Sequence, residues 1–169
     1  MMRAVGKVPP GAGARSTDHP DLAAILPSLL IGEYLLPGDL RWLAEAHNVS
    51  AVVNLQDNQD LQALGIDLRE LRRAARSYGI AYHHVPIPDC EPERLVTELD
   101  VLLAMLTHLE AKGRITYLHC NAGLNRAPTV AIAYLRSRIP TSLAHACAHV
   151  KACRACGPYM QVLERYFAS

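Results

Sequence analysis

The sequence has few aromatic side chains, no excess of charge and no long apolar run. None of its hydrophobic stretches approaches the roughly 20 residues that cross a bilayer, so we expect no membrane span. The net charge of the 169 residues is +1, without a cluster of lysine and arginine, which argues against a nucleic-acid partner. One tryptophan and one phenylalanine leave little of the aromatic surface on which sugars stack.

Cysteine is also scarce. There are five, an odd number without paired spacing, which is typical of a reducing compartment, so we expect a cytoplasmic protein. Two histidines and two cysteines share one stripe of an expected helix: His145, His149, Cys153 and Cys156. On a continuous helix these four would span about 16 Å, so one metal ion could contact at most two neighbours. We therefore expect no metal and no other cofactor.

Residues 1–20 are rich in glycine and proline and lack apolar periodicity, so we expect a disordered N-terminal tail. The basic residues Arg3, Lys7 and Arg15 in this tail would also fit a transit peptide, but the stretch is short and broken by prolines. Residues 21–169 should then form a single domain, which is long enough to bury a core without disulfides or metal.

Apolar periodicity along this domain predicts alternating strands and helices. The expected strands are residues 29–31, 51–55, 80–85 and 115–119, and the expected helices are residues 39–47, 67–78, 91–112, 126–135, 141–153 and 158–167. Asp39 is the expected N-cap of the first helix, and Asp67 with Glu70 resembles a capping box at the second. This alternation is typical of an α/β fold with a mostly parallel central sheet of about five strands and helices on both faces.

One stretch, from Ile115 to Leu135, organises the rest of the chain. It predicts a buried strand, a tight loop that opens at Cys120, and a helix that begins near Arg126. Ligands of such sheets bind beyond the carboxyl ends of the strands, which is where this loop lies. The successive N–H groups of the loop can point at one phosphate group, and the arginine can offer a planar fork to two of its oxygens. The expected phosphate-binding residues are Asn121, Ala122, Gly123, Leu124, Asn125 and Arg126.

The same N–H groups, together with the end of the helix, stabilise a thiolate on Cys120, which makes this residue the candidate nucleophile. The alternative is an ordinary buried cysteine between a strand and a helix. Gly123, which permits a positive φ in the loop, and Pro128, which is tolerated in a first helical turn, favour the phosphate site.

The candidate acid is Asp89, in the proline-rich loop after the expected strand 80–85. Breaking a phosphate ester requires a proton for the leaving oxygen, and hydrolysing a phosphocysteine requires a base for water; one carboxyl group can do both in turn. Glu91 and Glu93 are rival acids in the same segment. His119 should support the loop through hydrogen bonds rather than transfer protons.

Residues 119–129, HCNAGLNRAPT, resemble the signature loop of the cysteine-dependent phosphatases, and of their dual-specificity branch in particular. That branch has its acid about thirty residues before the cysteine, and Asp89 fits this order. The resemblance implies a hydrolase that removes phosphate from monoesters through a phosphocysteine intermediate, with catalytic Cys120, Arg126 and Asp89. Most relatives have serine or threonine where this chain has Ala127, so we expect slower breakdown of the intermediate.

Three stretches are similar to the glucan phosphatases, the group of laforin and the plant starch-excess enzymes. They are CNAGLNRAP at 120–128, NLQDNQDLQALGIDL at 54–68, which resembles the recognition segment of that group, and CGP at 156–158. The likeness implies a phosphorylated glucan, or another phosphomonoester, as the substrate. The chain departs from that group where relatives have a glycine or aromatic residues: Asn125, Cys90, Ala63 and Leu64.

Two alternatives therefore stay open. One is the same chemistry on phosphotyrosine, phosphoserine or a phosphoinositide. The other is a catalytically silent module that binds phosphate. The sequence also leaves open a protective disulfide between Cys90 and Cys120.

Overall fold

The computed structural model describes residues 15, 17–89 and 91–168. Most of the expected tail, residues 1–14 and 16, and Cys90, which follows the candidate acid, lie outside the described residues. Two described residues of the expected tail contact the first helix, since Arg15 pairs with Asp39 at 2.6 Å and the His19 ring stacks on Trp42.

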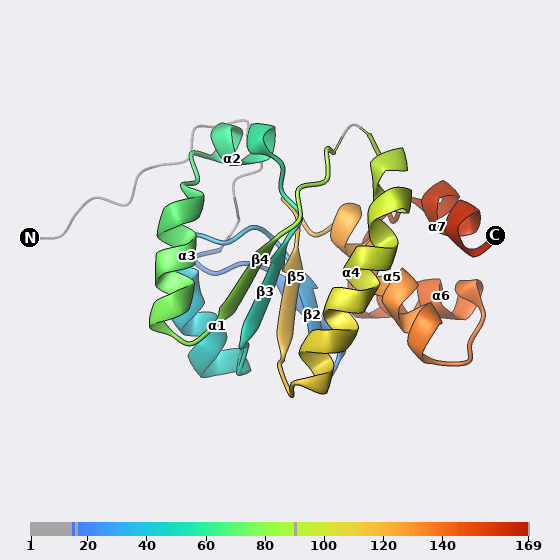
Figure 1. Cartoon of the computed structure of the whole chain (residues 1–169), viewed down its shortest axis with the longest axis horizontal. Helices are drawn as coiled ribbons and strands as arrows, with labels where there is room; N and C mark the ends of the chain where they lie inside the picture. Colours follow the sequence, from blue (N-terminus) through green and yellow to red (C-terminus); the bar gives the residue numbers. More distant parts are fainter. Residues whose placement is uncertain (1–14, 16, 90, 169) are drawn as a thin grey trace, which may run out of the picture.

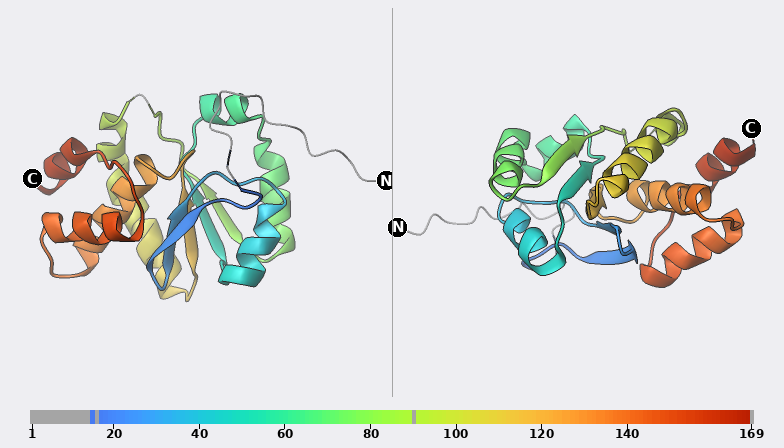
Figure 2. Two further views of the ribbon diagram at one scale, coloured as in Figure 1. Left: turned by 180° about the vertical axis from the view of Figure 1, so that it is seen from behind. Right: turned by 60° about the horizontal axis from the view of Figure 1, so that its bottom comes forward.

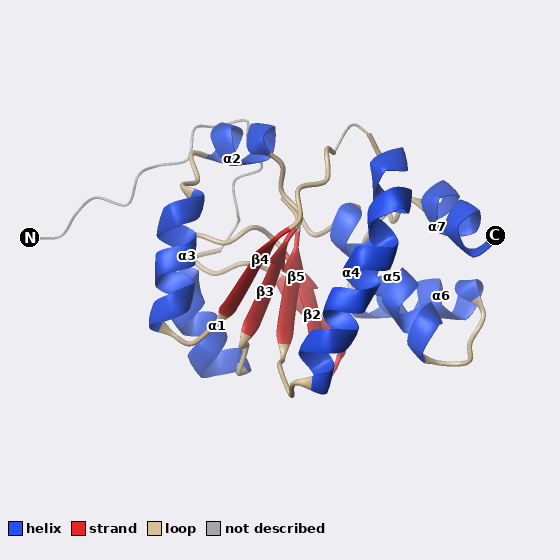
Figure 3. Ribbon diagram, in the orientation of Figure 1, coloured by secondary structure: helices blue, strands red, loops and turns tan. Residues whose placement is uncertain are grey.

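A five-stranded sheet lies at the centre of the molecule (Figure 3). The strands are β1 (Leu22–Leu26), β2 (Leu29–Gly32), β3 (Ala51–Asn54), β4 (Ala81–His84) and β5 (Thr116–His119), in the order β1-β2-β5-β3-β4. Every neighbouring pair is parallel except β1 and β2. The predicted α/β fold is confirmed, but β1 was not predicted, because this half-exposed strand has no clear alternation of apolar residues.

Helices cover both faces of the sheet (Figures 1 and 2). One face carries α1 (Asp39–His47) and α3 (Leu68–Ser77), and the other carries α4 (Glu93–Ala111), α5 (Arg126–Arg138), α6 (Leu143–Cys153) and α7 (Met160–Ala168). A separate apolar cluster fills each side of the sheet. In the described part of the chain, no helix is long and apolar enough to cross a membrane.

The N-terminal caps of two helices differ from the prediction. Gly38, not Asp39, is the N-cap of α1, and the Asp39 carboxylate accepts the N–H of Leu36 at 2.7 Å. Asp67 does cap α3 by accepting the N–H of Arg69, but no reciprocal bond from Glu70 occurs among the described residues.

The capping box is found instead at α2 (Asn58–Leu64), a helix that the sequence did not predict. The carboxylates of Asp57 and Asp60 each accept the backbone N–H of the other residue, at 2.8 and 2.9 Å. These bonds stabilise a helix of seven residues, which is too short to show a clear apolar period. The helix lies beyond the carboxyl end of β3, at the edge of the sheet where the loop after β5 begins (Figure 1).

Candidate active site

The loop from Cys120 to Asn125 connects β5 with α5. Each of its six backbone carbonyl oxygens accepts a hydrogen bond from another group of the protein. Their donors are, in order, His119 Nδ1, Tyr34 N, Arg154 Nη2, Arg154 Nε, Gly157 N and Thr129 Oγ1, at 2.7–2.9 Å. Within the described chain, the N–H groups of residues 121–125 donate to no other protein group. The loop therefore has free donors, as expected for an anion cradle.

Close packing requires a glycine at position 123. Gly123 has a φ of +67°, and a Cβ atom there would lie 2.6 Å from backbone atoms of Gly32 at the end of β2. A side chain would therefore strain the backbone and also push β2 away from the loop. This explains the glycine that the sequence analysis identified.

Arg154 holds the loop from behind, and the sequence analysis missed it. Its guanidinium donates to the carbonyl oxygens of Ala122 and Gly123 and pairs with Asp21 at 3.0 Å. The residue is almost fully buried, and it follows the last residue of α6. Nothing in the local pattern of the sequence distinguishes it from an ordinary residue at a helix end.

Arg126 is buried at the first position of α5, with 2 % of its surface exposed. Its Nη1 atom donates to Asp60 Oδ2 at 2.7 Å and to the Ile87 carbonyl at 2.8 Å. Its Nε atom lies 3.3 Å from Asp89 Oδ1, an ion-pair distance without hydrogen-bond geometry, and it has no hydrogen-bond partner among the described residues. Burial lowers the pKa of Arg126, but Asp60 and the other nearby negative groups raise it above its ordinary value, so the guanidinium stays charged.

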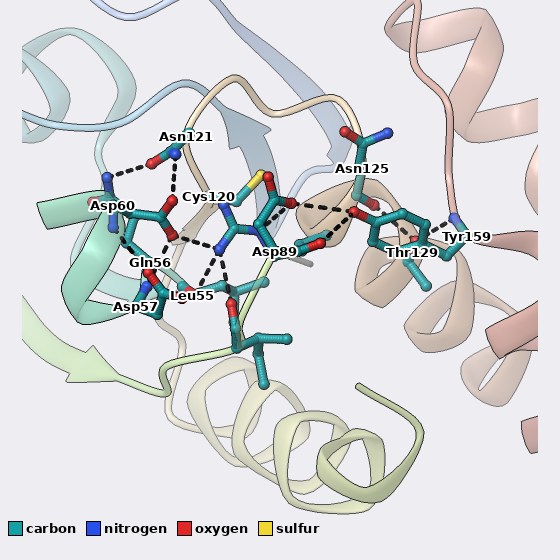
Figure 4. Close-up of polar contacts among 12 residues, drawn as sticks. Leu55, Gln56, Asp57, Asp60, Asp89, Cys120, Asn121, Asn125, Thr129 and Tyr159 are labelled. Carbon is teal, nitrogen blue, oxygen red and sulfur yellow. Dashed lines mark hydrogen bonds and ion pairs between the residues drawn. The ribbon is translucent and has the colours of Figure 1, made fainter. Parts of the chain in front are cut away.

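Asp60 is the second residue that sequence reasoning missed. Its two carboxylate oxygens divide between Arg126 and the side chain of Asn121, whose amide oxygen accepts from Gln56 at 2.7 Å (Figure 4). Burial raises the pKa of Asp60, but the hydrogen bonds and charge of its neighbours, Arg126 first among them, hold it below its ordinary value. Gln56 and Asp60 belong to the segment 54–68, so part of this segment supports the loop.

Asp89 lies in the loop after β4, beside the cradle (Figure 4). Its side chain is 55 % exposed, close to Arg126 and 3.1 Å from the hydroxyl of Tyr159. The rival acids are exposed, and Glu91 pairs with Arg94 instead. The structure thus brings Cys120, Arg126 and Asp89 to one site.

His119 is fully buried beneath the loop. Burial lowers its pKa to about 4, so the ring is neutral near pH 7, and its Nδ1 donates to the carbonyl of Cys120 at 2.9 Å. Both observations agree with a supporting role for this side chain.

The sequence matches the model of the dual specificity phosphatase catalytic domain over residues 40–163. The chain belongs to this family. It is 34 % identical over 114 residues to phosphoglucan phosphatase DSP4 of Castanea sativa, covering 66 % of this chain and 30 % of that protein. It is 35 % identical over 75 residues to dual specificity protein phosphatase 18 of Homo sapiens, covering 44 % and 40 %.

The chain spans less than half the length of these two relatives. The solved structure of PTPMT1 in complex with PI(5)P shares its fold, with a TM-score of 0.74 and 20 % identity over 87 % of this chain and 94 % of the other. Family membership rests on the sequence match, and this structural likeness supports the fold.

Proposed function

We propose that this chain is a cysteine-dependent phosphatase that acts on a phosphorylated glucan or a related sugar phosphate. The observation that carries the proposal is the arrangement around Cys120. Among the described residues, the loop N–H groups have no protein acceptor, and Nε of the buried Arg126 lies 3.3 Å from Asp89 Oδ1. Nucleophile, anion site and acid thus share one rim of the sheet.

In the first step, the thiolate of Cys120 attacks phosphorus and the bond to the leaving oxygen breaks. The protonated carboxyl of Asp89 gives its proton to that oxygen. The loop N–H groups and Arg126 hold the phosphoryl oxygens, which carry the charge of the transition state. A phosphate oxygen bound at Arg126 Nε takes the place of the nearby Asp89 carboxylate.

In the second step, water attacks the phosphocysteine and Asp89, now ionised, takes its proton. The S–P bond breaks, and phosphate and the Cys120 thiolate are released. The pair Arg126 and Asp60 keeps its charge balance through both steps, because neither side chain exchanges a proton in them.

The surroundings of the acid support a sugar as the rest of the substrate. A hollow of about 300 Å³ adjoins the Asp89 loop and is lined by Asp57, Asn58, Gln59, Pro86, Pro88, Glu91 and Arg94. Carboxylate and amide groups hydrogen-bond hydroxyls well. The 34 % identity to a phosphoglucan phosphatase points the same way.

We do not expect the sugar to stack on aromatic side chains. Leu64 is buried and Ala63 is small, so neither offers an aromatic face at the positions where the resembling group has one. We therefore expect recognition through polar groups such as Asn58 and Gln59.

The four described cysteines are free thiols, which supports a reducing compartment such as the cytoplasm. We also propose residues 21–169 as the single catalytic domain.

The second candidate is a protein or phosphoinositide phosphatase. Its support is the 35 % identity to dual specificity protein phosphatase 18 over 75 residues. A silent binding module is less well supported, because Cys120, Arg126 and Asp89 are all present in one site.

The test is phosphate release from phosphorylated amylopectin, a phosphotyrosyl peptide and a phosphoinositide, each with Cys120→Ser as the blank. We expect the highest kcat/KM on amylopectin. In Asn58→Ala this value should fall about tenfold while that for p-nitrophenyl phosphate stays unchanged, since only the sugar reaches the hollow. Higher activity on the peptide or the lipid would favour the second candidate, and equal signal from enzyme and blank would leave only the binding module.

A further inference from the structure

Tyr159 connects the candidate acid with the end of the loop. It lies immediately before α7, and its hydroxyl donates to Asp89 Oδ1 at 3.1 Å and lies 3.3 Å from the Asp89 carbonyl oxygen. Its backbone N–H donates to Thr129 Oγ1 at 2.8 Å, and that hydroxyl donates to the Asn125 carbonyl at 2.7 Å (Figure 4). The backbone of Tyr159 is thus fixed to the loop while its side chain holds the acid.

We propose that Tyr159 is a positioning residue that fixes the carboxyl group of Asp89 for proton transfer. The inference rests on the proposed function, because it assumes that Asp89 is the acid. Tyr159 lies 70 positions from Asp89, so no local pattern in the sequence connects the two residues.

The need for such a residue follows from the exposure of Asp89. Its side chain is 55 % exposed on a proline-rich loop, and in the described structure two groups contact it, Arg126 Nε and the Tyr159 hydroxyl. When a phosphate oxygen occupies Nε, the contact with Arg126 is lost. The bond from Tyr159 then remains to hold the carboxyl near the leaving oxygen, and such orientation contributes directly to the rate.

The groups around Asp89 keep the Tyr159 hydroxyl protonated, so that it can donate to the carboxylate. Arg126 faces Asp89 from α5 and Tyr159 from the segment before α7, while Glu91 and Arg94 pair with each other nearby. Burial, followed by the charge of Asp89, raises the pKa of Tyr159 to about 12, so its hydroxyl keeps its proton over the working pH range. The Tyr159 hydroxyl is therefore a permanent donor that holds the Asp89 carboxyl in one orientation.

The test compares wild type with Tyr159→Phe, which keeps the ring and removes the hydroxyl. We expect kcat/KM for phosphorylated amylopectin, an alkyl ester that requires the acid, to fall about tenfold. For p-nitrophenyl phosphate, whose leaving group requires little protonation, the loss should stay within about twofold. The loss for amylopectin should appear in kcat and not in KM, because the hydroxyl orients the acid and does not bind the substrate.

Tyr166→Phe is the matched control. Tyr166 also donates to a carboxylate, Asp100 Oδ1 at 2.6 Å, in a bond that joins α7 to α4. Removal of this hydroxyl should leave both kcat/KM values as in wild type. An equal loss in this variant would point to a general effect of the lost hydroxyl on stability and would overturn the proposal.

A double variant separates this inference from the proposed function. In an Asp89→Asn background, Tyr159→Phe should cause no further loss, because its effect passes through the acid. Two results would overturn the role of Tyr159 and leave the proposed function standing. One is that Tyr159→Phe behaves as wild type. The other is that Asp89→Asn loses the basic limb of the pH profile, but the double variant shows the product of the two single losses in kcat/KM. If Asp89→Asn keeps the basic limb, the acid itself must be reassigned.

Discussion

Nη1 of Arg126 lies 2.7 Å from Oδ2 of Asp60, and both side chains are at least nine-tenths buried. A buried guanidinium without a counter-ion is strongly unfavourable, so this carboxylate is what allows the arginine to lie beneath the loop. The same contact fixes Nη1, while Nε has no hydrogen-bond partner among the described residues and lies beside Asp89 at the candidate phosphate site. Asp60 therefore determines the orientation of Arg126.

Replacing Asp60 should weaken anion binding. Asp60→Asn removes the charge that fixes Arg126, and we expect kcat/KM to fall about tenfold or more and tungstate to inhibit correspondingly less well. Asp57→Asn is the control, since it removes the other charge of the same capping box without contact to Arg126, and asparagine remains a good N-cap. Because Asp57 also lines the proposed sugar hollow, both variants are compared with p-nitrophenyl phosphate and tungstate, which do not reach it. Equal tungstate inhibition in wild type and Asp60→Asn would contradict the role assigned to this residue.

Replacing Arg154 should destabilise the loop. Arg154→Met leaves the carbonyl oxygens of Ala122 and Gly123 without donors, at about 1–3 kcal/mol each in the free energy of unfolding. Urea unfolding measures this loss, and tungstate affinity should fall with it. Asp21→Asn is the control, because its carboxylate is 68 % exposed and should change stability by less than about 1 kcal/mol. Wild-type stability in Arg154→Met would contradict the interpretation.

Acid should destabilise the fold through His119. Its pKa is about 4 in the folded chain and about 6.5 when unfolded, so between these values only the unfolded state binds the proton. The free energy of unfolding is therefore unaffected by protonation of His119 well above pH 6.5, and it decreases by about 2–3 kcal/mol as the pH falls to 4.5. Urea unfolding at both pH values should show a smaller decrease in His119→Asn, which retains a donor for Cys120. Parallel pH profiles in the two proteins would rule this origin out.

Breakdown of the intermediate should be slow because of Ala127. This residue is fully buried. By the resemblance to the dual-specificity branch, we expect a serine or threonine hydroxyl at this position to help the thiolate leave. In rapid-mixing experiments with p-nitrophenyl phosphate, wild type should show a burst of nitrophenol followed by a slower steady state. Ala127→Ser should raise the steady-state rate about tenfold and reduce the burst. The same steady-state rate in both proteins, with an unchanged burst, would count against the idea.

The elements that the sequence missed are those with weak local signals. Strand β1 is half exposed and acquires its structure by pairing with β2, and α2 is shorter than two full turns and depends on its capping box. The Asp39 N-cap was wrong by one residue, because its carboxylate turns back to Leu36 instead. Periodicity reports burial over several turns or alternations, and none of these features is long enough to show it.

The sequence by itself determined the alternation of strands and helices and the loop from Cys120 to Arg126, because a strand end, a tight glycine turn and a helix start are set by neighbouring residues. The tertiary structure alone decided which distant side chains support that loop. Asp60 and Arg126 are 66 positions apart, Arg154 and Gly123 are 31 apart, and Tyr159 and Asp89 are 70 apart. Such pairs depend on how the helices pack around the sheet, and this packing leaves no repeating pattern in the sequence.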